Sequence, residues 1–304
     1  GSLLSQQCLQ ELASGAETVC LPVFQSTSAL TVGNQACPRS RPRTPLDVIG
    51  QMDEFLQEVV LPHGGRATEL ASELTIRLRE LPLADGVHGS TGNMLWHSGV
   101  VLARELLRRP DVIRGKRIVE LGAGCGLLGI AAASLASYAL LTDGDEEAAD
   151  NLAHNVRLNE HVWRSMGGDT SPTCEVHTRC LSWQDAVDSP IFATEEERAD
   201  VALGSDIIYG HWGDDVAKAM LSMLRAGGLI FLASSEDRRS GIPAFQRHLR
   251  ERGFRVEETK LETPLGTFRI YECRARLAGE PQEDPEVCER VESEPSEGSV
   301  RLAG

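Results

Sequence analysis

The chain of 304 residues has no uninterrupted run of about 18 apolar residues, which excludes a conventional membrane-spanning helix. Behind Gly1 and Ser2 there is no charged segment followed by an apolar core, so we expect no signal peptide. Basic side chains are also scarce, because 30 Lys and Arg residues face 45 Asp and Glu residues and the net charge is −15. Nucleic-acid binding needs a clustered basic surface, so we expect neither nucleic acid nor a membrane as a partner. Basic protein segments suit this charge better.

Cysteine patterns that hold metals or build disulfide frameworks are missing too. The eight cysteines are scattered, with no CxxC pair and no Cys/His cluster at zinc spacing. We therefore expect free thiols, no metal site and a reducing compartment, namely the cytoplasm with the nucleus as an alternative. Residues 280–297 are acidic, contain proline and carry few large apolar side chains, a composition typical of a disordered tail.

Apolar spacing predicts an alternation of strands and helices along the chain. Residues 46–61 predict a helix, the alternation of Leu74, Ile76 and Leu78 predicts a strand, and residues 96–108 predict a helix that ends before Pro110. Further strands are expected at residues 117–121, 138–142, 174–180, 199–205, 229–233, 254–261 and 268–275. Helices are expected between them at residues 126–135, 146–159, 214–225 and 242–252.

This alternation predicts an α/β fold with a doubly wound, mostly parallel sheet of seven strands and helices on both faces. The last two strands are joined by the turn ETPLG, which is too short for a parallel crossover, so an antiparallel C-terminal hairpin is expected. We divide the chain into a partly helical N-terminal extension (residues 1–70), the α/β domain (residues 71–278) and the acidic disordered tail (residues 279–304).

A glycine-rich turn follows the strand at residues 117–121, in the stretch VELGAGCGLLG. Doubly wound sheets bind ligands outside the carboxyl ends of their strands, and glycines let the backbone approach a ligand closely. The dinucleotide fingerprint GxGxxG needs a third glycine where Leu127 stands, and Glu120 would repel a pyrophosphate. A dinucleotide site is therefore disfavoured, while a tight strand-to-helix turn without any ligand remains an alternative.

A carboxylate follows the next strand as well. Asp143 comes directly after YALLT, where it could accept hydrogen bonds from a ribose diol. The alternative is a helix N-cap, a role that either Asp143 or Asp145 could take for the helix that follows.

Four stretches in order resemble the seven-β-strand protein-lysine methyltransferases, a family of class I S-adenosylmethionine-dependent methyltransferases that modify chaperones, elongation factors and calmodulin. They are GNMLWHSGVVL (residues 92–102), VELGAGCGLLGIAAA (119–133), LLTDGDEEAADNLAHNVRLN (140–159) and ADVALGSDIIYG (199–210). The second is similar to the family's ExGxGxG motif, and the fourth to its D/E-x-x-Y/F signature. Cys125 departs from the pattern, because Thr or Ser commonly stands there, and we expect it to present its backbone more than its thiol.

The resemblance implies a Rossmann-like methyltransferase fold that binds S-adenosylmethionine, with the carboxylate of Glu120 suited to the ammonium of the methionine moiety. It places eight residues at the cofactor: Trp96, Glu120, Gly122, Ala123, Gly124, Asp143, Trp183 and Ser205. The two tryptophans could instead be plain core residues.

The same resemblance places Asp206 and Tyr209 beside the transferable methyl group. Asp206 would hold the incoming lysine or assist its deprotonation, and Tyr209 would wall the channel; a loop cap and simple packing are the alternative roles. His211 and Trp212 follow at once and could line the mouth of the site.

The function implied is methyl transfer to the side-chain amine of lysine in a non-histone protein, such as a chaperone, a translation factor or a calmodulin-like protein, by a monomeric enzyme. A small-molecule N- or O-methyltransferase on the same fold is the alternative. A cofactor-binding interaction module is a further one.

Overall fold

The computed structural model describes residues 19–22, 55–63, 72–81, 91–165, 174–236, 240–263 and 265–276. Most of the predicted extension (residues 1–70), including the first part of the predicted helix, lies outside these residues, as does the acidic segment from residue 279 onward. Within the described residues no helix is long and apolar enough to cross a membrane. The same residues contain no group of three or more His, Cys, Asp or Glu side chains that could hold a metal ion.

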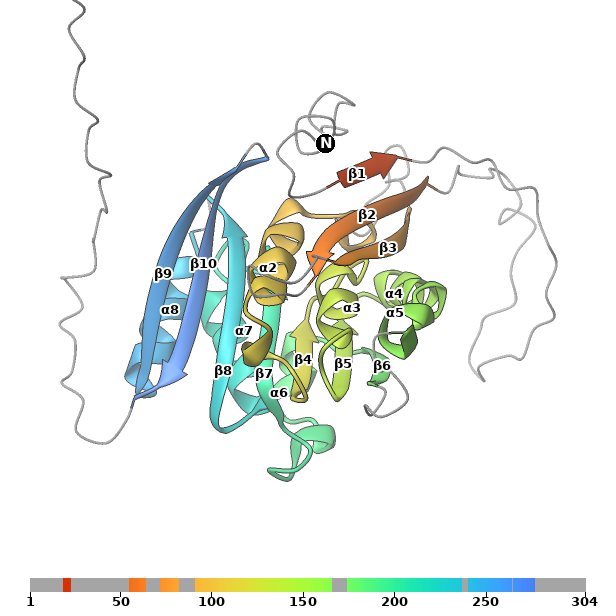
Figure 1. Ribbon diagram of the computed structural model, residues 1–304. Coiled ribbons are helices and arrows are strands. Elements are labelled where there is room, and N and C mark those ends of the chain that lie inside the picture. The colour runs from red at the N-terminus through yellow and green to blue at the C-terminus, as the bar shows by residue number, and fades with distance from the viewer. Residues whose placement is uncertain are drawn as a thin grey trace, which may run out of the picture.

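A seven-stranded sheet with the order β6-β5-β4-β7-β8-β10-β9 forms the centre of the molecule (Figure 1). Its strands are β4 (Arg117–Leu121), β5 (Tyr138–Asp143), β6 (Glu175–Cys180), β7 (Ala199–Ser205), β8 (Leu224–Ser235), β9 (Phe254–Thr263) and β10 (Gly266–Ala275). Strands β4 to β8 pair in parallel, whereas β10 is antiparallel to both β8 and β9. The predicted doubly wound sheet and its antiparallel C-terminal hairpin are confirmed.

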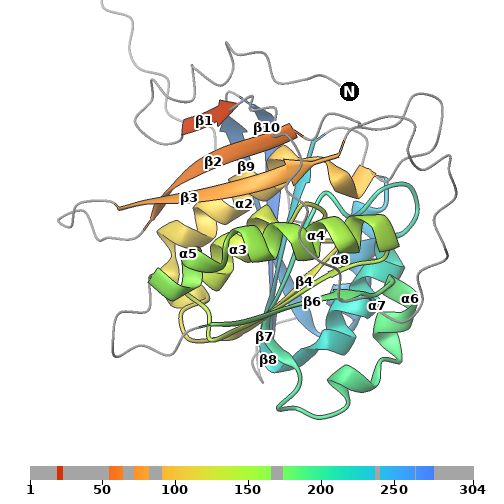
Figure 2. The ribbon, with the colours of Figure 1, turned by 90° about the vertical axis from the view of Figure 1, so that its right-hand side faces the viewer.

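Helices cover both faces of this sheet (Figure 2), which is why β4, β5 and β7 are almost continuously buried. On one face lie α2 (His97–Arg108), α3 (Leu127–Ala133), α4 (Glu146–Leu158) and α5 (Glu160–Ser165). On the other lie α6 (Trp183–Val187), α7 (Gly213–Met223) and α8 (Ile242–Glu251). The described residues also form the short 3-10 helices η2 (Thr91–Asn93), η3 (Pro110–Val112) and η4 (Pro190–Phe192). Two buried clusters result, with Leu102 and Leu128 in the first and Met220 and Phe245 in the second.

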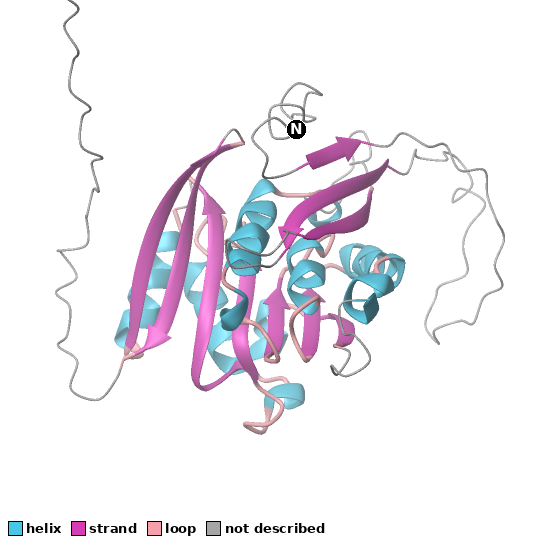
Figure 3. Ribbon diagram, in the orientation of Figure 1, coloured by secondary structure: helices cyan, strands magenta, loops and turns pink. Residues whose placement is uncertain are grey.

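A second sheet of three antiparallel strands, β1 (Val19–Pro22), β2 (Phe55–His63) and β3 (Ser72–Glu80), lies over the helices of the first face (Figure 3). The helix predicted for residues 46–61 is therefore wrong from residue 55 onward. Buried Val59 and Leu61 alternate along β2 and pair with Ile76 and Leu74 of β3. The short apolar run fits the period of a helix as well as that of a strand. Its pairing with β3 makes these residues extended.

The outer edge of β3 is bound by asparagine side chains and not by another strand. Asn151, Asn155 and Asn159 lie four residues apart on one face of α4 and its C-cap, and all three are fully buried. Asn155 accepts from the Arg79 N–H (2.8 Å) and donates to the Arg79 carbonyl (3.1 Å). Asn159 does the same with Arg77, at 2.8 and 2.6 Å. We call these three residues the asparagine ladder.

The asparagine ladder also reaches the glycine turn. The side-chain amide of Asn155 donates a second hydrogen bond to the carbonyl of Cys125, at 3.0 Å. Asn151 donates to the Arg79 carbonyl (3.0 Å) and accepts from the Arg79 Nε (2.8 Å). One helix therefore fixes both the edge strand of the small sheet and the turn after β4.

Replacing Asn155 by alanine should destabilise the protein strongly. The substitution leaves the Arg79 N–H and the Cys125 carbonyl without these partners in a buried site, and each such loss costs about 1–3 kcal/mol. We expect urea unfolding to give a free energy of unfolding lower by about 2–4 kcal/mol. The control is Arg157→Ala on the exposed face of α4, which should change it by less than about 0.5 kcal/mol. Equal effects of the two substitutions would contradict the role of the ladder.

Candidate active site

The functional site lies at the carboxyl ends of β4, β5 and β7, where the strand order reverses on either side of β4. A cavity of about 900 Å³ opens there. All ten side chains or glycines predicted for the site line this cavity: Trp96, Glu120, Gly122, Ala123, Gly124, Asp143, Trp183, Ser205, Asp206 and Tyr209. Residues from five separate stretches of the chain are thus brought together in one place.

The backbone of the turn after β4 explains its glycine spacing. Gly122, Gly124 and Gly126 have φ angles of 65°, 55° and 89°, in the left-handed region that side chains disfavour. A Cβ on Gly124 would also lie 2.9 Å from the carbonyl oxygen of Gly92, which is too close. The turn therefore offers bare backbone to the cavity, a cradle that any larger residue would fill.

Close packing of α3 on the sheet is supplied by a glycine outside this spacing. A Cβ on Gly129 would lie 2.4 Å from Glu120 Oε2 and 2.5 Å from Leu141 Cδ2. In the dinucleotide fingerprint the third glycine serves this purpose from a position occupied here by Leu127. Leu127 is buried in the core instead.

Glu120 lies beneath the turn and is only 1% exposed. Burial raises the pKa of its carboxyl to about 8, and the negative charge of Asp143 adds to the rise. The backbone N–H of Gly129 opposes it, although neither carboxyl oxygen reaches hydrogen-bond geometry with any described residue. A buried carboxyl without partners in a cavity wall suits a cationic group on a ligand.

Asp143 faces the same cavity and does not cap the helix that follows. Its oxygens accept hydrogen bonds from the backbone N–H groups of Gly124 (2.9 Å) and Asp145 (3.1 Å). The N-cap of α4 is Asp145, which accepts from the Ala148 N–H at 2.9 Å. Burial raises the pKa of Asp143, while those two backbone hydrogen bonds lower it. Asp143 is therefore placed to accept from a diol, and its contact with a ribose stays a prediction.

Aromatic side chains form the rim of the cavity. The ring of Trp183 lies 5.6 Å from that of Tyr209 and 5.9 Å from that of Trp212, measured between centroids, and we call these three residues the aromatic rim. Tyr209 is 54% exposed, and partial burial together with the charge of Asp143 raises the pKa of its phenol. Trp96 is 45% exposed and donates its Nε1–H to the Thr91 carbonyl (3.0 Å), so it is not a core residue. Trp183 is half-buried, packs at the edge of the second core cluster and also lines the cavity.

Asp206 has a φ of 53° and is the one non-glycine residue with positive φ in the described part of the chain. Its Oδ2 accepts a hydrogen bond from the hydroxyl of Ser98 (2.5 Å). Its Oδ1 accepts from both the N–H (2.9 Å) and the hydroxyl (3.1 Å) of Ser235. Asp206 therefore ties the loop after β7 to its neighbours and lines the cavity at the same time.

Sequence reasoning missed several residues that line the cavity. Four of them lie in the segment before α2, namely Thr91, Gly92, Met94 and Leu95. The other two directly follow predicted residues: Gln184 follows Trp183, and Ile207 follows Asp206. The resemblance covers residues 92–102 as one stretch, but it did not predict that Gly92 lies against the glycine turn. Trp212 lines the cavity, as the sequence suggested.

Cys125 borders the cavity, but its thiol is buried. It is 2% exposed and donates to the carbonyl of Gly92 at 3.7 Å, while its own carbonyl accepts from Asn155. Cys125, Cys174, Cys180 and Cys273 are free thiols.

A family model described as lysine methyltransferase matches residues 77–251. The chain belongs to the lysine methyltransferase family. It is 29% identical over 207 residues to the protein N-lysine methyltransferase METTL21A of Danio rerio, which covers 68% of this chain and 88% of that protein. It is 37% identical over 155 residues to the protein N-terminal and lysine N-methyltransferase efm7 of Schizosaccharomyces pombe, covering 50% of this chain and 53% of that protein. The chain thus spans about half the length of the second relative.

Among solved structures, the chain is similar to the Thermus thermophilus 16S rRNA N2 G1207 methyltransferase in complex with AdoMet and guanosine. The sequence identity is 18%, the match covers 73% of this chain and 51% of that chain, and the TM-score is 0.48.

S-adenosylmethionine is the cofactor of this methyltransferase, and the cavity fits its parts. The glycine turn would leave room for the methionine moiety, and the carboxyl of Glu120 would lie near its ammonium. Asp143 would accept from the ribose diol, and the ring of Trp183 would offer a flat apolar face to the adenine. These contacts stay predictions.

Substituting Gly124 by alanine should weaken cofactor binding. The new Cβ meets the Gly92 carbonyl and sits at a positive φ, so the turn must shift. We expect calorimetric titration with S-adenosylmethionine to give a Kd at least about tenfold higher. The matched control is Gly115→Ala, which has the same positive φ but open space around the new Cβ. A Kd that rises equally in both variants would show that the clash with Gly92 is irrelevant.

Substituting Glu120 by glutamine should flatten the pH dependence of stability. The folded-state pKa of about 8 lies above the ordinary value of 4.5, so the folded protein holds an extra proton between these two pH values. The free energy of unfolding of the wild type should therefore fall as pH rises through that window. Urea unfolding at about pH 5.5 and about pH 8.5 should show the wild type losing a few kcal/mol relative to Glu120→Gln. Parallel pH curves for the two proteins would contradict the raised pKa.

Proposed function

We propose that this methyltransferase transfers a methyl group from S-adenosylmethionine to the side-chain amine of a lysine in another, non-histone protein. The observation that carries this proposal is the position of Asp206, which lines the same cavity as the glycine turn and the aromatic rim. A carboxylate and exposed aromatic faces at the open side of a cofactor cavity suit an incoming ammonium on a long apolar stem.

Bound S-adenosylmethionine would supply an activated methyl group: the lone pair of a neutral amine would attack the methyl carbon in line, and the carbon–sulfur bond would break with its electron pair kept by sulfur. Free lysine has a pKa near 10.4, so the amine must first give its proton to solvent. In our proposal Asp206 receives the lysine head group as an ammonium and then orients the neutral amine toward the methyl group. Tyr209 and Trp212 of the aromatic rim wall the lysine stem and exclude water, so that Tyr209 acts by position and not as a base.

The net charge of this chain and the names of its relatives together support a class of acceptor protein. The net charge of −15 favours an acceptor lysine within a basic segment. Other relatives are named protein-lysine N-methyltransferase EEF2KMT (Bos taurus) and calmodulin-lysine N-methyltransferase (Arabidopsis thaliana). A chaperone, a translation factor or a calmodulin-like protein is the class of acceptor that we propose, met by a monomeric enzyme in the cytoplasm or the nucleus.

Incubating the protein with S-adenosylmethionine labelled in its methyl group and a cell lysate should label a discrete protein band. The Asp206→Asn variant keeps a side chain that tolerates positive φ but loses the charge, and it should label that band at least about tenfold more slowly. Arg157→Ala, far from the cavity on the exposed face of α4, should label like the wild type.

Two outcomes would contradict the proposal. Label that appears only in products of low mass would make this chain a small-molecule methyltransferase. A protein that binds S-adenosylmethionine but labels nothing in several lysates, with Asp206→Asn indistinguishable from the wild type, would make it a cofactor-binding module.

A further inference from the structure

The backbone at Asp206 is strained, and that strain requires something to hold it. A φ of 53° is costly for a residue with a Cβ, although aspartate tolerates it better than most. Such conformations persist where the surroundings over-determine them, and they cluster at functional sites. The groups that donate hydrogen bonds to Asp206 are therefore candidates for residues that shape the site.

Ser98 holds Asp206 from the helix before the glycine turn. It is the second residue of α2 and is fully buried, and its hydroxyl donates to Asp206 Oδ2 across a sequence separation of 108 residues. The next residue, Gly99, lets α2 approach the end of β7 closely, because a Cβ there would lie 3.2 Å from the hydroxyl of Ser205. A buried hydroxyl that meets a carboxylate in this way has little freedom to point elsewhere.

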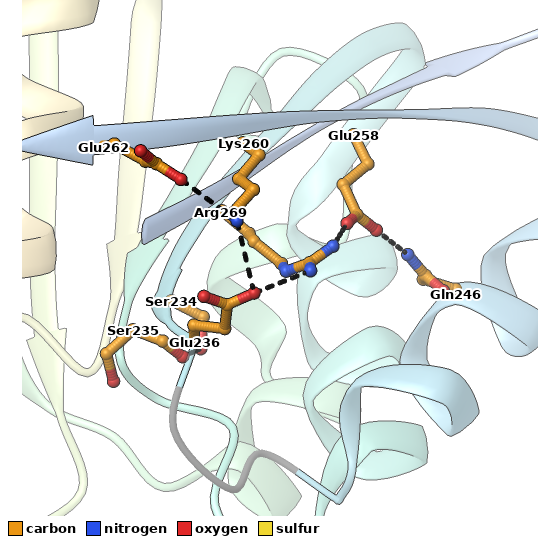
Figure 4. Close-up of polar contacts among 8 residues, drawn as sticks. All are labelled: Ser234, Ser235, Glu236, Gln246, Glu258, Lys260, Glu262 and Arg269. Carbon is orange, nitrogen blue, oxygen red and sulfur yellow. Dashed lines mark hydrogen bonds and ion pairs between the residues drawn. The ribbon is translucent and has the colours of Figure 1, made fainter. Parts of the chain in front are cut away.

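Ser235 holds the other oxygen from the end of β8. Its N–H and its hydroxyl both donate to Asp206 Oδ1. The next residue, Glu236, is fixed by the neighbouring strand: its N–H donates to the Thr267 carbonyl (3.1 Å), and its carboxylate accepts from Arg269 Nη2 (2.9 Å). Figure 4 shows Arg269 between the carboxylates of Glu236 and Glu258, with Ser235 next to Glu236 in the chain.

We propose that Ser98 and Ser235 are positioning residues that fix the carboxylate of Asp206 in the orientation that receives the acceptor lysine. This inference rests on the proposed function and adds two residues to it. Donors from α2 and β8 engage both oxygens, so the carboxylate cannot rotate away from the cavity wall without breaking a charge-assisted hydrogen bond. The two serines touch neither cofactor nor substrate and act only through Asp206.

The test is a double-mutant cycle on methyl transfer to the labelled protein band. Ser98→Ala should lower kcat/KM for the acceptor about tenfold or more, and Ser235→Ala, which keeps the N–H contact, should lower it less. Asp206→Gly removes the carboxylate and suits the positive φ, so it should lower kcat/KM further. Because Ser98 acts through that carboxylate, the double variant should match Asp206→Gly within about twofold.

Controls separate positioning from loss of structure. The Kd for S-adenosylmethionine should stay within about twofold of the wild type in every serine variant. Ser235→Thr keeps a hydroxyl at a half-buried position and should restore the activity that Ser235→Ala loses. The matched control for losing a buried hydroxyl is Ser134→Ala, whose hydroxyl donates to the Ala131 carbonyl (2.6 Å) and which should leave kcat/KM unchanged.

The outcomes distinguish the inference from the function beneath it. If the wild type labels the band and the Ser98 and Asp206 effects multiply, or Ser98→Ala behaves like the wild type, the positioning role is wrong while the proposed function stands. If the wild type methylates no protein, the proposed function fails and the inference fails with it.

Discussion

The contact between three buried asparagine amides and the outer edge of β3 is the constraint on which the rest of the structure depends. A strand edge in a dry core must find partners for its N–H and carbonyl groups, and here Asn155 and Asn159 supply them in pairs. The same helix face binds the Cys125 carbonyl, so the small sheet, α4 and the glycine turn are held in one arrangement. A shift of α4 would therefore move the cofactor cradle as well as the small sheet.

The site joins two groups of residues that follow the neighbouring strands β4 and β7 of the central sheet. On one side the loop at Gly92 lies against the glycine turn so closely that only glycine fits at residue 124. On the other side Ser98 reaches Asp206 at the end of β7. Both contacts come from the segment around η2 and α2, which spans the cavity from the cofactor cradle to the proposed lysine position. This segment gives the site its shape, and the acidic side chains of Asp143 and Asp206 line it.

The resemblance to a known family collected the ten residues that line one cavity. Local pattern was enough to predict the central sheet, because each strand and each turn is encoded within a few residues. It was not enough where a distant partner decides the outcome. Residues 55–61 were predicted as helix because their apolar spacing is ambiguous, and they are extended because β3 pairs with them. Ser98 and Ser235 gave no signal in the sequence, since a serine becomes informative only when Asp206 is seen beside it. Asp206 was predicted at the site, but its positive φ was not.

The central claim is that the carboxylate of Asp206 receives the side-chain amine of a lysine at the methyl donor. The most direct measurement is the identity of the amino acid that carries the label after acid hydrolysis of the methylated acceptor protein. This account predicts label recovered as N-methylated lysine, and far less of it when the enzyme is Asp206→Asn. Label recovered in arginine, histidine or an N-terminal residue, or in lysine to the same extent with both enzymes, would contradict it.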